Sequence, residues 1–231
     1  MSAFAFEFVG GPLFDRQLTH LVLLALLLAG LYTVIGDNAL RGQWLGLDTK
    51  RWIICAALVP ILHQVYVWFA WRTEEYHQWF SRRFGSWAFP VYGAVFVMLL
   101  VSRLLSVLAL AIANHGTIGF SPTVGWFLSL LLAIPLVYLF YSVARYFTFR
   151  RAMGIDHFDA SYLDLPLVRQ GIFRLSPNAM YVFGFLVLWI PGLALRSEAA
   201  LWLALFNHLY IWVHYYTIEL PDLRRLYKTP V

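Results

Sequence analysis

Long apolar runs alternate with short polar segments along the whole chain. A transmembrane helix needs about 20 mostly apolar residues to cross a hydrocarbon core of roughly 30 Å. Six runs meet or nearly meet that length: Leu18 to Ile35, Trp52 to Trp71, Trp87 to Ala113, Val124 to Phe147, Met180 to Leu195 and Ala199 to Glu219. The pattern predicts an all-α, polytopic membrane helix bundle of about six transmembrane helices.

The last two runs are separated by only a few residues. Pro191 and Gly192 lead into Arg196, Ser197 and Glu198, a combination that is typical of a tight turn. Two apolar helices joined by so short a connection must lie antiparallel. The sequence therefore predicts that the chain ends in a helical hairpin.

The composition agrees with a membrane protein, because 61% of the residues are hydrophobic and only 13% are charged. No Gly/Ser-rich or Pro-rich linker divides the chain, so we expect one integral membrane domain, residues 1–231. The single cysteine, Cys55, cannot form an internal disulfide. The net charge of +5 does not predict nucleic-acid binding, because the arginines lie in short segments between apolar runs, where they set topology.

Arginine and lysine concentrate on one predicted side of the membrane. That side receives Arg16 and the basic segments 72–83, 145–174 and 224–228. The other side receives Arg41, Lys50, Arg51 and Arg196. Since positively charged loops are retained in the cytoplasm, we expect both termini to be cytoplasmic.

Two polar segments meet at one membrane face if the hairpin forms. The first is "GIFRLSPNAMY", residues 171 to 181, in which Pro177 and Asn178 suit the start of a helix. The second is "HYYTIELPDLRRLY", residues 214 to 227, in which Glu219 closes an apolar run. A carboxylate near bilayer depth is costly and usually has a partner or a functional role.

These segments resemble the C-terminal signature of the membrane-embedded methyltransferases that include isoprenylcysteine carboxyl methyltransferase and phosphatidylethanolamine N-methyltransferase. The positions that match in order are Gly171, Phe173, Arg174, Asn178, Met180, Tyr181, Glu219 and Tyr227. The chain departs from the pattern at Pro177, Ala179 and Ile218.

The resemblance implies a site for S-adenosylmethionine at the cytoplasmic end of the last two helices, within residues 165–231, with a lipid-like acceptor entering from the bilayer. By the same resemblance the cofactor contacts are Leu167, Val168, Phe173, Asn178, Ala179, Met180, Tyr181 and Glu219.

The chemistry of the cofactor adds further candidates. A sulfonium cation suits a carboxylate or aromatic faces, and the amino-acid end of the cofactor needs a cation, which Arg174 or Arg225 would supply. An amine acceptor must lose a proton, for which Glu219 and His214 are the candidate catalytic bases.

Three residues are candidates for the acceptor: Arg103, Tyr215 and Arg225. Arg103 lies mid-span, where an arginine either holds an acceptor headgroup or braces another helix. Asp156, His157 and Asp159 share one polar loop, which we interpret as solvated loop polarity, so no metal is predicted.

Three classes of function remain open. The leading one is an S-adenosylmethionine-dependent methyltransferase acting on a membrane lipid or small hydrophobic acceptor. Within the family Asn178 favours a phospholipid amine. The alternatives are a nicotinamide-dependent membrane reductase of the sterol/steroid reductase type and a non-enzymatic transport or assembly protein. The sequence leaves the identity of the acceptor and the oligomeric state open.

Overall fold

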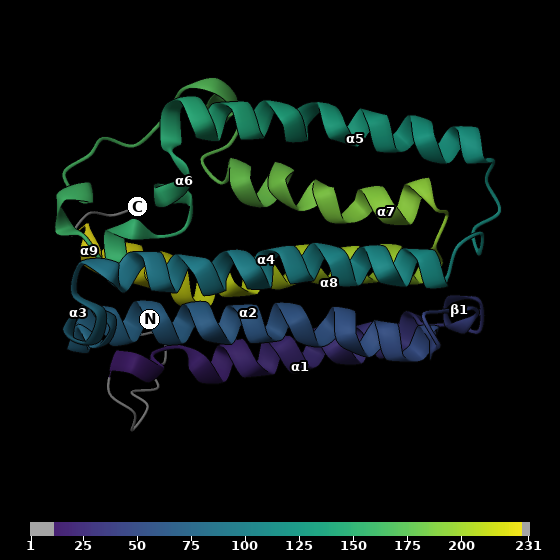
Figure 1. Ribbon diagram of the computed structural model, residues 1–231, viewed down its shortest axis with the longest axis horizontal. Helices are drawn as coiled ribbons and strands as arrows, with labels where there is room; N and C mark the ends of the chain where they lie inside the picture. The colour runs from purple at the N-terminus through teal and green to yellow at the C-terminus, as the bar shows by residue number, and fades with distance from the viewer. Residues whose placement is uncertain (1–11, 228–231) are drawn as a thin grey trace, which may run out of the picture.

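The computed structural model describes residues 12–227, which form a bundle of parallel and antiparallel helices (Figure 1). Within that range, four helical stretches are long and apolar enough to cross a membrane: Gln17–Val34, Thr49–His77, Trp79–Ala113 and Pro122–Phe147. The first two are α1 and α2. The predicted all-α membrane bundle is confirmed.

The other two long stretches are each built from more than one element. The third comprises α3 (Trp79–Phe84), a 3₁₀ turn (Gly85–Trp87) and α4 (Ala88–Ala113). The fourth comprises α5 (Pro122–Ser142) and a π-helical turn (Val143–Phe147).

The predicted C-terminal hairpin is present, and its first arm is irregular. That arm comprises a π-helical turn (Met180–Gly184), a 3₁₀ turn (Phe185–Leu188) and α7 (Trp189–Ala194). The second arm is α8 (Glu198–His214), which continues through a π-helical turn (Tyr215–Glu219) into α9 (Leu220–Leu226).

The turn of this hairpin is held by its own backbone. The Ser197 amide donates a hydrogen bond to the Gly192 carbonyl over 2.8 Å, and the Ser197 hydroxyl caps α8 by accepting from the Ala200 amide. A Cβ atom on Gly192 would lie 2.6 Å from a methyl group of Leu201. A larger residue at position 192 would therefore force the Leu201 side chain to move.

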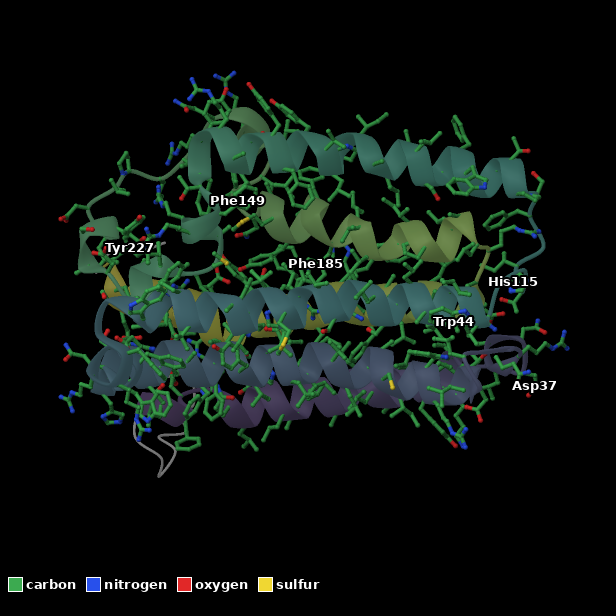
Figure 2. The ribbon with its side chains drawn as sticks, in the orientation of Figure 1. Asp37, Trp44, His115, Phe149, Phe185 and Tyr227 are labelled. Carbon is green, nitrogen blue, oxygen red and sulfur yellow. The ribbon has the colours of Figure 1, made fainter. Side chains whose placement is uncertain are left out.

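The loops at the hairpin turn gather around one buried amide, Asn114. Its side-chain oxygen accepts from Ser197 and from the Ala199 amide, and its nitrogen donates to the carbonyls of Asn38 and Arg41. The small strands β1 (Gln43–Trp44) and β2 (Leu47–Asp48) pair antiparallel nearby. We call this the β1 end; Trp44 and His115 lie there, whereas Tyr227 lies at the opposite, α9 end (Figure 2).

Small side chains allow the helices to pack closely in the middle of the bundle. The central core includes the fully buried residues Ala56, Ala111, Ala199, Ala200 and Ala204. By contrast, α5 exposes large apolar side chains such as Leu130 (65%) and Ile134 (67%) on its outer face. Outward apolar side chains and inward small ones are the arrangement that a lipid solvent favours, and the chain is an integral membrane protein.

A buried ion pair ties the two ends of the chain together at the α9 end. Arg72 of α2 contacts Asp222 of α9 over 3.2 Å, and neither side chain is exposed. Arg72 also donates to the carbonyls of Leu13 and Asp15, over 2.9 and 2.7 Å. Arg225 contacts Asp222 as well. The guanidinium of Arg72 thereby fixes the start of the described chain, α2 and α9 in one arrangement.

The loop after α5 packs back into this end of the bundle. It contains α6 (Phe149–Ala152) and two 3₁₀ turns (Ile155–His157 and Ala160–Tyr162). The buried His157 ring stacks on Trp71, with ring centroids 4.3 Å apart. Burial lowers the pKa of His157 from 6.5 to about 3, so the folded protein holds this imidazole neutral.

We expect Arg72→Met to destabilise the protein by about 3–5 kcal/mol, because it leaves a buried carboxylate with one arginine partner fewer and two backbone carbonyls without their donor. The measurement is the melting temperature of the detergent-purified protein. Arg82→Gln, which removes an exposed arginine of α3, is the matched control. A wild-type melting temperature for Arg72→Met would contradict the role given to the ion pair.

We expect His157→Phe to make the free energy of unfolding less dependent on pH below pH 6.5. Below pH 6.5 the unfolded chain binds a proton at His157 that the folded chain does not bind until about pH 3. The wild type therefore loses up to about 1.4 kcal/mol per pH unit as the pH falls, and the variant keeps the stacked ring without this loss. Melting curves of both proteins between pH 7 and pH 4 test this; parallel profiles would refute it.

Candidate functional site

The structure brings together three of the predicted site residues at the α9 end of the hairpin. The Tyr181 hydroxyl donates a hydrogen bond to the Glu219 carboxylate, although the two residues are 38 positions apart. The ring centroid of Tyr181 lies 5.6 Å from that of Tyr215 and 5.9 Å from that of Trp212. We call Tyr181, Trp212, Tyr215 and Glu219 the Tyr181 cluster. It presents a half-buried carboxylate beside aromatic rings.

Helical periodicity explains why these residues meet. Positions three and four apart share a helix face, so one stripe of the first arm meets one stripe of the second. Trp189 Nε1 donates to His208 Nδ1 over 3.2 Å, and the Phe185 ring lies 5.7 Å from the His208 ring. The same stripes continue to Tyr181 at the α9 end. The antiparallel hairpin therefore pairs the stripe 181, 185 and 189 with the stripe 208, 212, 215 and 219.

Asn178 lies just before the cluster, at the start of a helical segment as predicted, and its side chain does not cap that segment. The hydroxyl of Ser176 accepts from the Asn178 amide, and the Asn178 carbonyl accepts from the amides of Tyr181 and Val182. Within residues 12–227, the half-buried side-chain amide of Asn178 has no hydrogen-bond partner. The Ser176 hydroxyl accepts from the Asn178 backbone amide because a hydroxyl two positions earlier reaches that amide in a tight turn.

The segment before Asn178 is anchored on the end of α5. Gly171 has a left-handed φ of 58°, and a Cβ atom there would lie 2.5 Å from the Ser142 hydroxyl oxygen. That hydroxyl accepts from the Ile172 amide over 3.1 Å. Phe173 stacks on Phe147, with centroids 5.1 Å apart. One apolar cluster here contains four of the predicted cofactor residues, Val168, Phe173, Ala179 and Met180.

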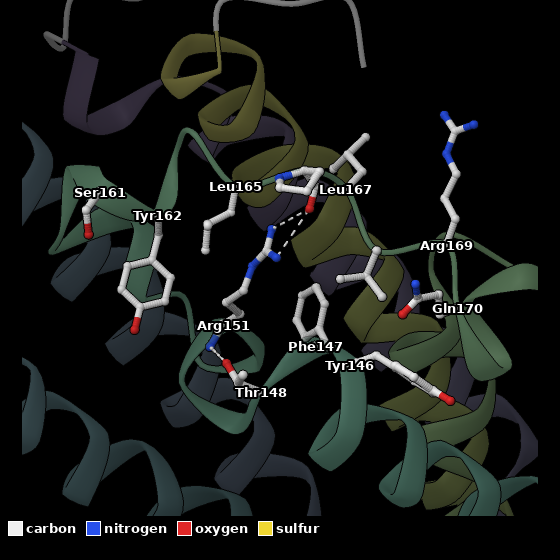
Figure 3. Close-up of a pocket in the computed structure, with 12 residues that line it drawn as sticks. Tyr146, Phe147, Thr148, Arg151, Ser161, Tyr162, Leu165, Leu167, Arg169 and Gln170 are labelled. Carbon is white, nitrogen blue, oxygen red and sulfur yellow. Dashed lines mark hydrogen bonds between the residues drawn. The ribbon is translucent and has the colours of Figure 1, made fainter.

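A cavity of about 630 Å³ adjoins this segment (Figure 3). Leu167 and Val168 line one side, and Phe147 and Tyr162 line another. Arg151 also lines it, donating to the Pro166 carbonyl over 3.4 and 3.5 Å. The loop residues that the resemblance assigns to the cofactor therefore border a real cavity.

The two arginines predicted for the cofactor carboxylate lie outside the Tyr181 cluster. Arg174 lines a second cavity, together with Arg145. Arg225 contacts Asp222, Glu75 and Asp15 in ion pairs. Arg225 is therefore part of the structural network at the α9 end, a role that its position in the sequence did not reveal.

The other candidate base, His214, is the last residue of α8, and Glu219 ends the π-helical turn that follows. The buried His214 ring packs edge-on against Trp71 of α2, with centroids 5.7 Å apart. Among residues 12–227, no side-chain hydrogen bond joins it to Tyr181 or Glu219.

Arg103 braces another helix, which was one of the two roles considered for it from the sequence. Its Nε donates to the buried Asn207 of α8 over 2.7 Å, and the guanidinium lies 5.1 Å from the centre of the Phe185 ring. Its Nη2 atom has no partner among residues 12–227. Arg103 therefore joins α4 to both arms of the hairpin one turn below Tyr181.

Asp156 and Asp159, in the loop after α6, accept hydrogen bonds from other residues of the protein. The Tyr227 hydroxyl donates to Asp156 over 3.1 Å, and Asp159 accepts from the Ser161 amide over 3.0 Å. Burial raises the pKa of Asp156, and the Tyr227 hydrogen bond partly offsets this.

A group that the sequence did not indicate comprises Glu75, His157 and Asp222, whose ligand atoms lie within 4.8 Å of one another. Arg72 and Arg225 already balance its two carboxylates. A bound metal cation would therefore add net positive charge to a buried site.

The comparisons with known proteins agree with this geometry. Residues 121–230 match the family model described as phospholipid methyltransferase, which confirms the resemblance seen in the sequence. The chain has no significant match among curated proteins or solved structures. The matched region contains α5, both cavities and the whole Tyr181 cluster. This membrane protein is therefore similar to the phospholipid methyltransferase family over residues 121–230.

Proposed function

We propose that the protein transfers a methyl group from S-adenosylmethionine to a lipid acceptor, and that the acceptor is a phospholipid amine. The family match supports a membrane methyltransferase acting on phospholipid. The observation that carries the proposal is the hydrogen bond from Tyr181 to Glu219, because it brings a carboxylate and aromatic faces together at the α9 end of the hairpin.

The residues at the α9 end of the hairpin fit the proposed cofactor. When bound, S-adenosylmethionine supplies a methyl group on a cationic sulfur. The carboxylate of Glu219 and the ring of Tyr181 would stabilise that positive charge. The unpartnered amide of Asn178 offers both a donor and an acceptor for polar groups of the cofactor. Leu167 and Val168 would contact it from the adjoining cavity.

The acceptor would approach from the lipid side, past Tyr215. This ring lies between Tyr181 and Tyr216, and Tyr216 is 54% exposed on the outer surface. An ammonium headgroup must lose a proton before its nitrogen can attack a methyl group, and Glu219 would accept it. The aromatic rings would limit the access of water, so most of the rate enhancement would come from alignment. His214, whose ring packs against Trp71 of α2, takes no part in this proposal.

The binding of S-adenosylhomocysteine to the purified protein, measured by isothermal titration, tests the cofactor site. We expect Glu219→Gln and Asn178→Ala to weaken binding about 10- to 100-fold, because each removes a polar partner in a half-buried site. Tyr181→Phe should weaken it less, by about fivefold, since the ring remains.

Glu198→Gln is the matched control, since it neutralises a glutamate of α8 at the β1 end. Failure of the wild type to bind S-adenosylhomocysteine would overturn the proposed function. Unchanged affinity of both Glu219→Gln and Asn178→Ala would place the cofactor elsewhere.

We also propose that the α9 end faces the cytoplasm, because the basic segments gather there. In a Cys55→Ser background, Arg82→Cys would report on the α9 end and His115→Cys on the β1 end. In sealed cells or vesicles of known orientation, an impermeant maleimide should label His115→Cys from the outside and Arg82→Cys only after permeabilisation. The reverse pattern would show the opposite orientation.

A further inference from the structure

The second cavity at the α9 end has a composition that differs from the Tyr181 cluster. It has a volume of about 610 Å³ and is lined by Tyr138, Arg145, Tyr146, Gln170, Gly171 and Arg174. Arg145 and Arg174 reach it from segments 29 positions apart, the π-helical turn after α5 and the 3₁₀ turn Gly171–Arg174. Two guanidinium groups therefore converge on one concave surface.

Within residues 12–227, neither of these two arginines has an anionic partner. Among residues 12–227, the ion pairs at this end of the bundle use Arg72 and Arg225. Arg145 lies over the Tyr146 ring, 5.7 Å from its centre, and both Arg145 and Arg174 are exposed. Gln170 adds a neutral amide to the lining. The cavity thus offers several hydrogen-bond donors and a charge of +2 without a counter-ion.

An anion is the expected ligand of two unpaired arginines. The position of the cavity relative to the bilayer indicates where that anion would come from. Ile134, Tyr138 and Tyr141 are spaced four and three residues apart on the outer face of α5 and are 67%, 44% and 56% exposed. Arg145 follows four residues later. The tyrosine rings pack together, with centroids 6.5 Å apart for Tyr138 and Tyr141. Tyrosines of this kind mark the border between hydrocarbon and headgroups, so the arginines lie at headgroup depth.

We propose that this cavity binds the phosphate of an anionic phospholipid, with the lipid's acyl chains lying along the outer stripe of α5. An arginine pair suits a phosphate because guanidinium groups form paired hydrogen bonds to its oxygens. The ligand is a lipid and not a free anion because the exposed stripe of Ile134, Tyr138 and Tyr141 leads along α5 to Arg145 and would contact acyl chains. None of the six lining residues belongs to the Tyr181 cluster, and Tyr146 and Gln170 are shared with the first cavity.

The test is a titration of the full-length, detergent-purified protein with short-chain phosphatidylglycerol, followed by microscale thermophoresis. The double variant Arg145→Gln/Arg174→Gln should bind about 30-fold more weakly than the wild type, because each basic residue near a lipid headgroup contributes about a fivefold change in affinity. Arg145→Lys/Arg174→Lys should retain much of the binding, since it keeps the charge. The control Arg82→Gln/Arg83→Gln removes the same charge from α3 and should bind like the wild type.

Several outcomes would overturn the proposal. Equal binding by wild type and Arg145→Gln/Arg174→Gln would do so, as would an equal loss in the α3 control, which indicates diffuse attraction only. Inorganic phosphate binding to the wild type as tightly as the lipid would exclude a lipid site. The double variant should bind S-adenosylhomocysteine as the wild type does. A loss of S-adenosylhomocysteine binding in that variant would assign the arginines to the cofactor, whereas failure of the wild type to bind it refutes only the proposed function.

Discussion

The buried pair of Arg72 and Asp222 is the constraint on which the α9 end of the molecule depends. A guanidinium removed from water must satisfy its donors, and Arg72 does so with one carboxylate and with backbone carbonyls near the start of the described chain. Asp222 lies three residues after Glu219, so the pair also sets where Glu219 lies. The ion pair thereby links the first helices to the Tyr181 cluster, whose residues all come from the last third of the sequence.

The backbone near the site departs repeatedly from regular helix. Within residues 12–227, π-helical turns occur at Val143–Phe147, Met180–Gly184 and Tyr215–Glu219. Each turn contributes to the site or adjoins it: the first carries Phe147 and Arg145, the second Tyr181 and the third Glu219. A π-helical turn changes the face on which the following side chains lie, and such turns are frequent at functional sites. The irregular backbone therefore helps to set the directions in which these side chains project.

The sequence predicted those parts of the site that depend on periodicity and missed those that depend on tertiary contacts. The apolar runs predicted the spans, and the short turn between the last two predicted the hairpin that brings residues 171–181 and 214–227 to one end. Arg225 looked available for a ligand because two of its three partners, Glu75 and Asp15, are 150 and 210 residues away along the chain. The group of Glu75, His157 and Asp222 was hidden for the same reason.

Arginine shows this limit most clearly, because the same side chain has three roles at three depths. Arg72 is buried and paired with a carboxylate, and Arg103 is buried and holds the amide of Asn207. Arg145 and Arg174 are exposed at the border of the bilayer and have no ion-pair partner in the described part of the chain. In the sequence most of these arginines contribute only to the excess of positive charge that orients the protein in the membrane. What separates structure from binding is the presence of an internal partner: a guanidinium that already has its anion braces helices, and one that lacks it at headgroup depth attracts the anion from the lipid.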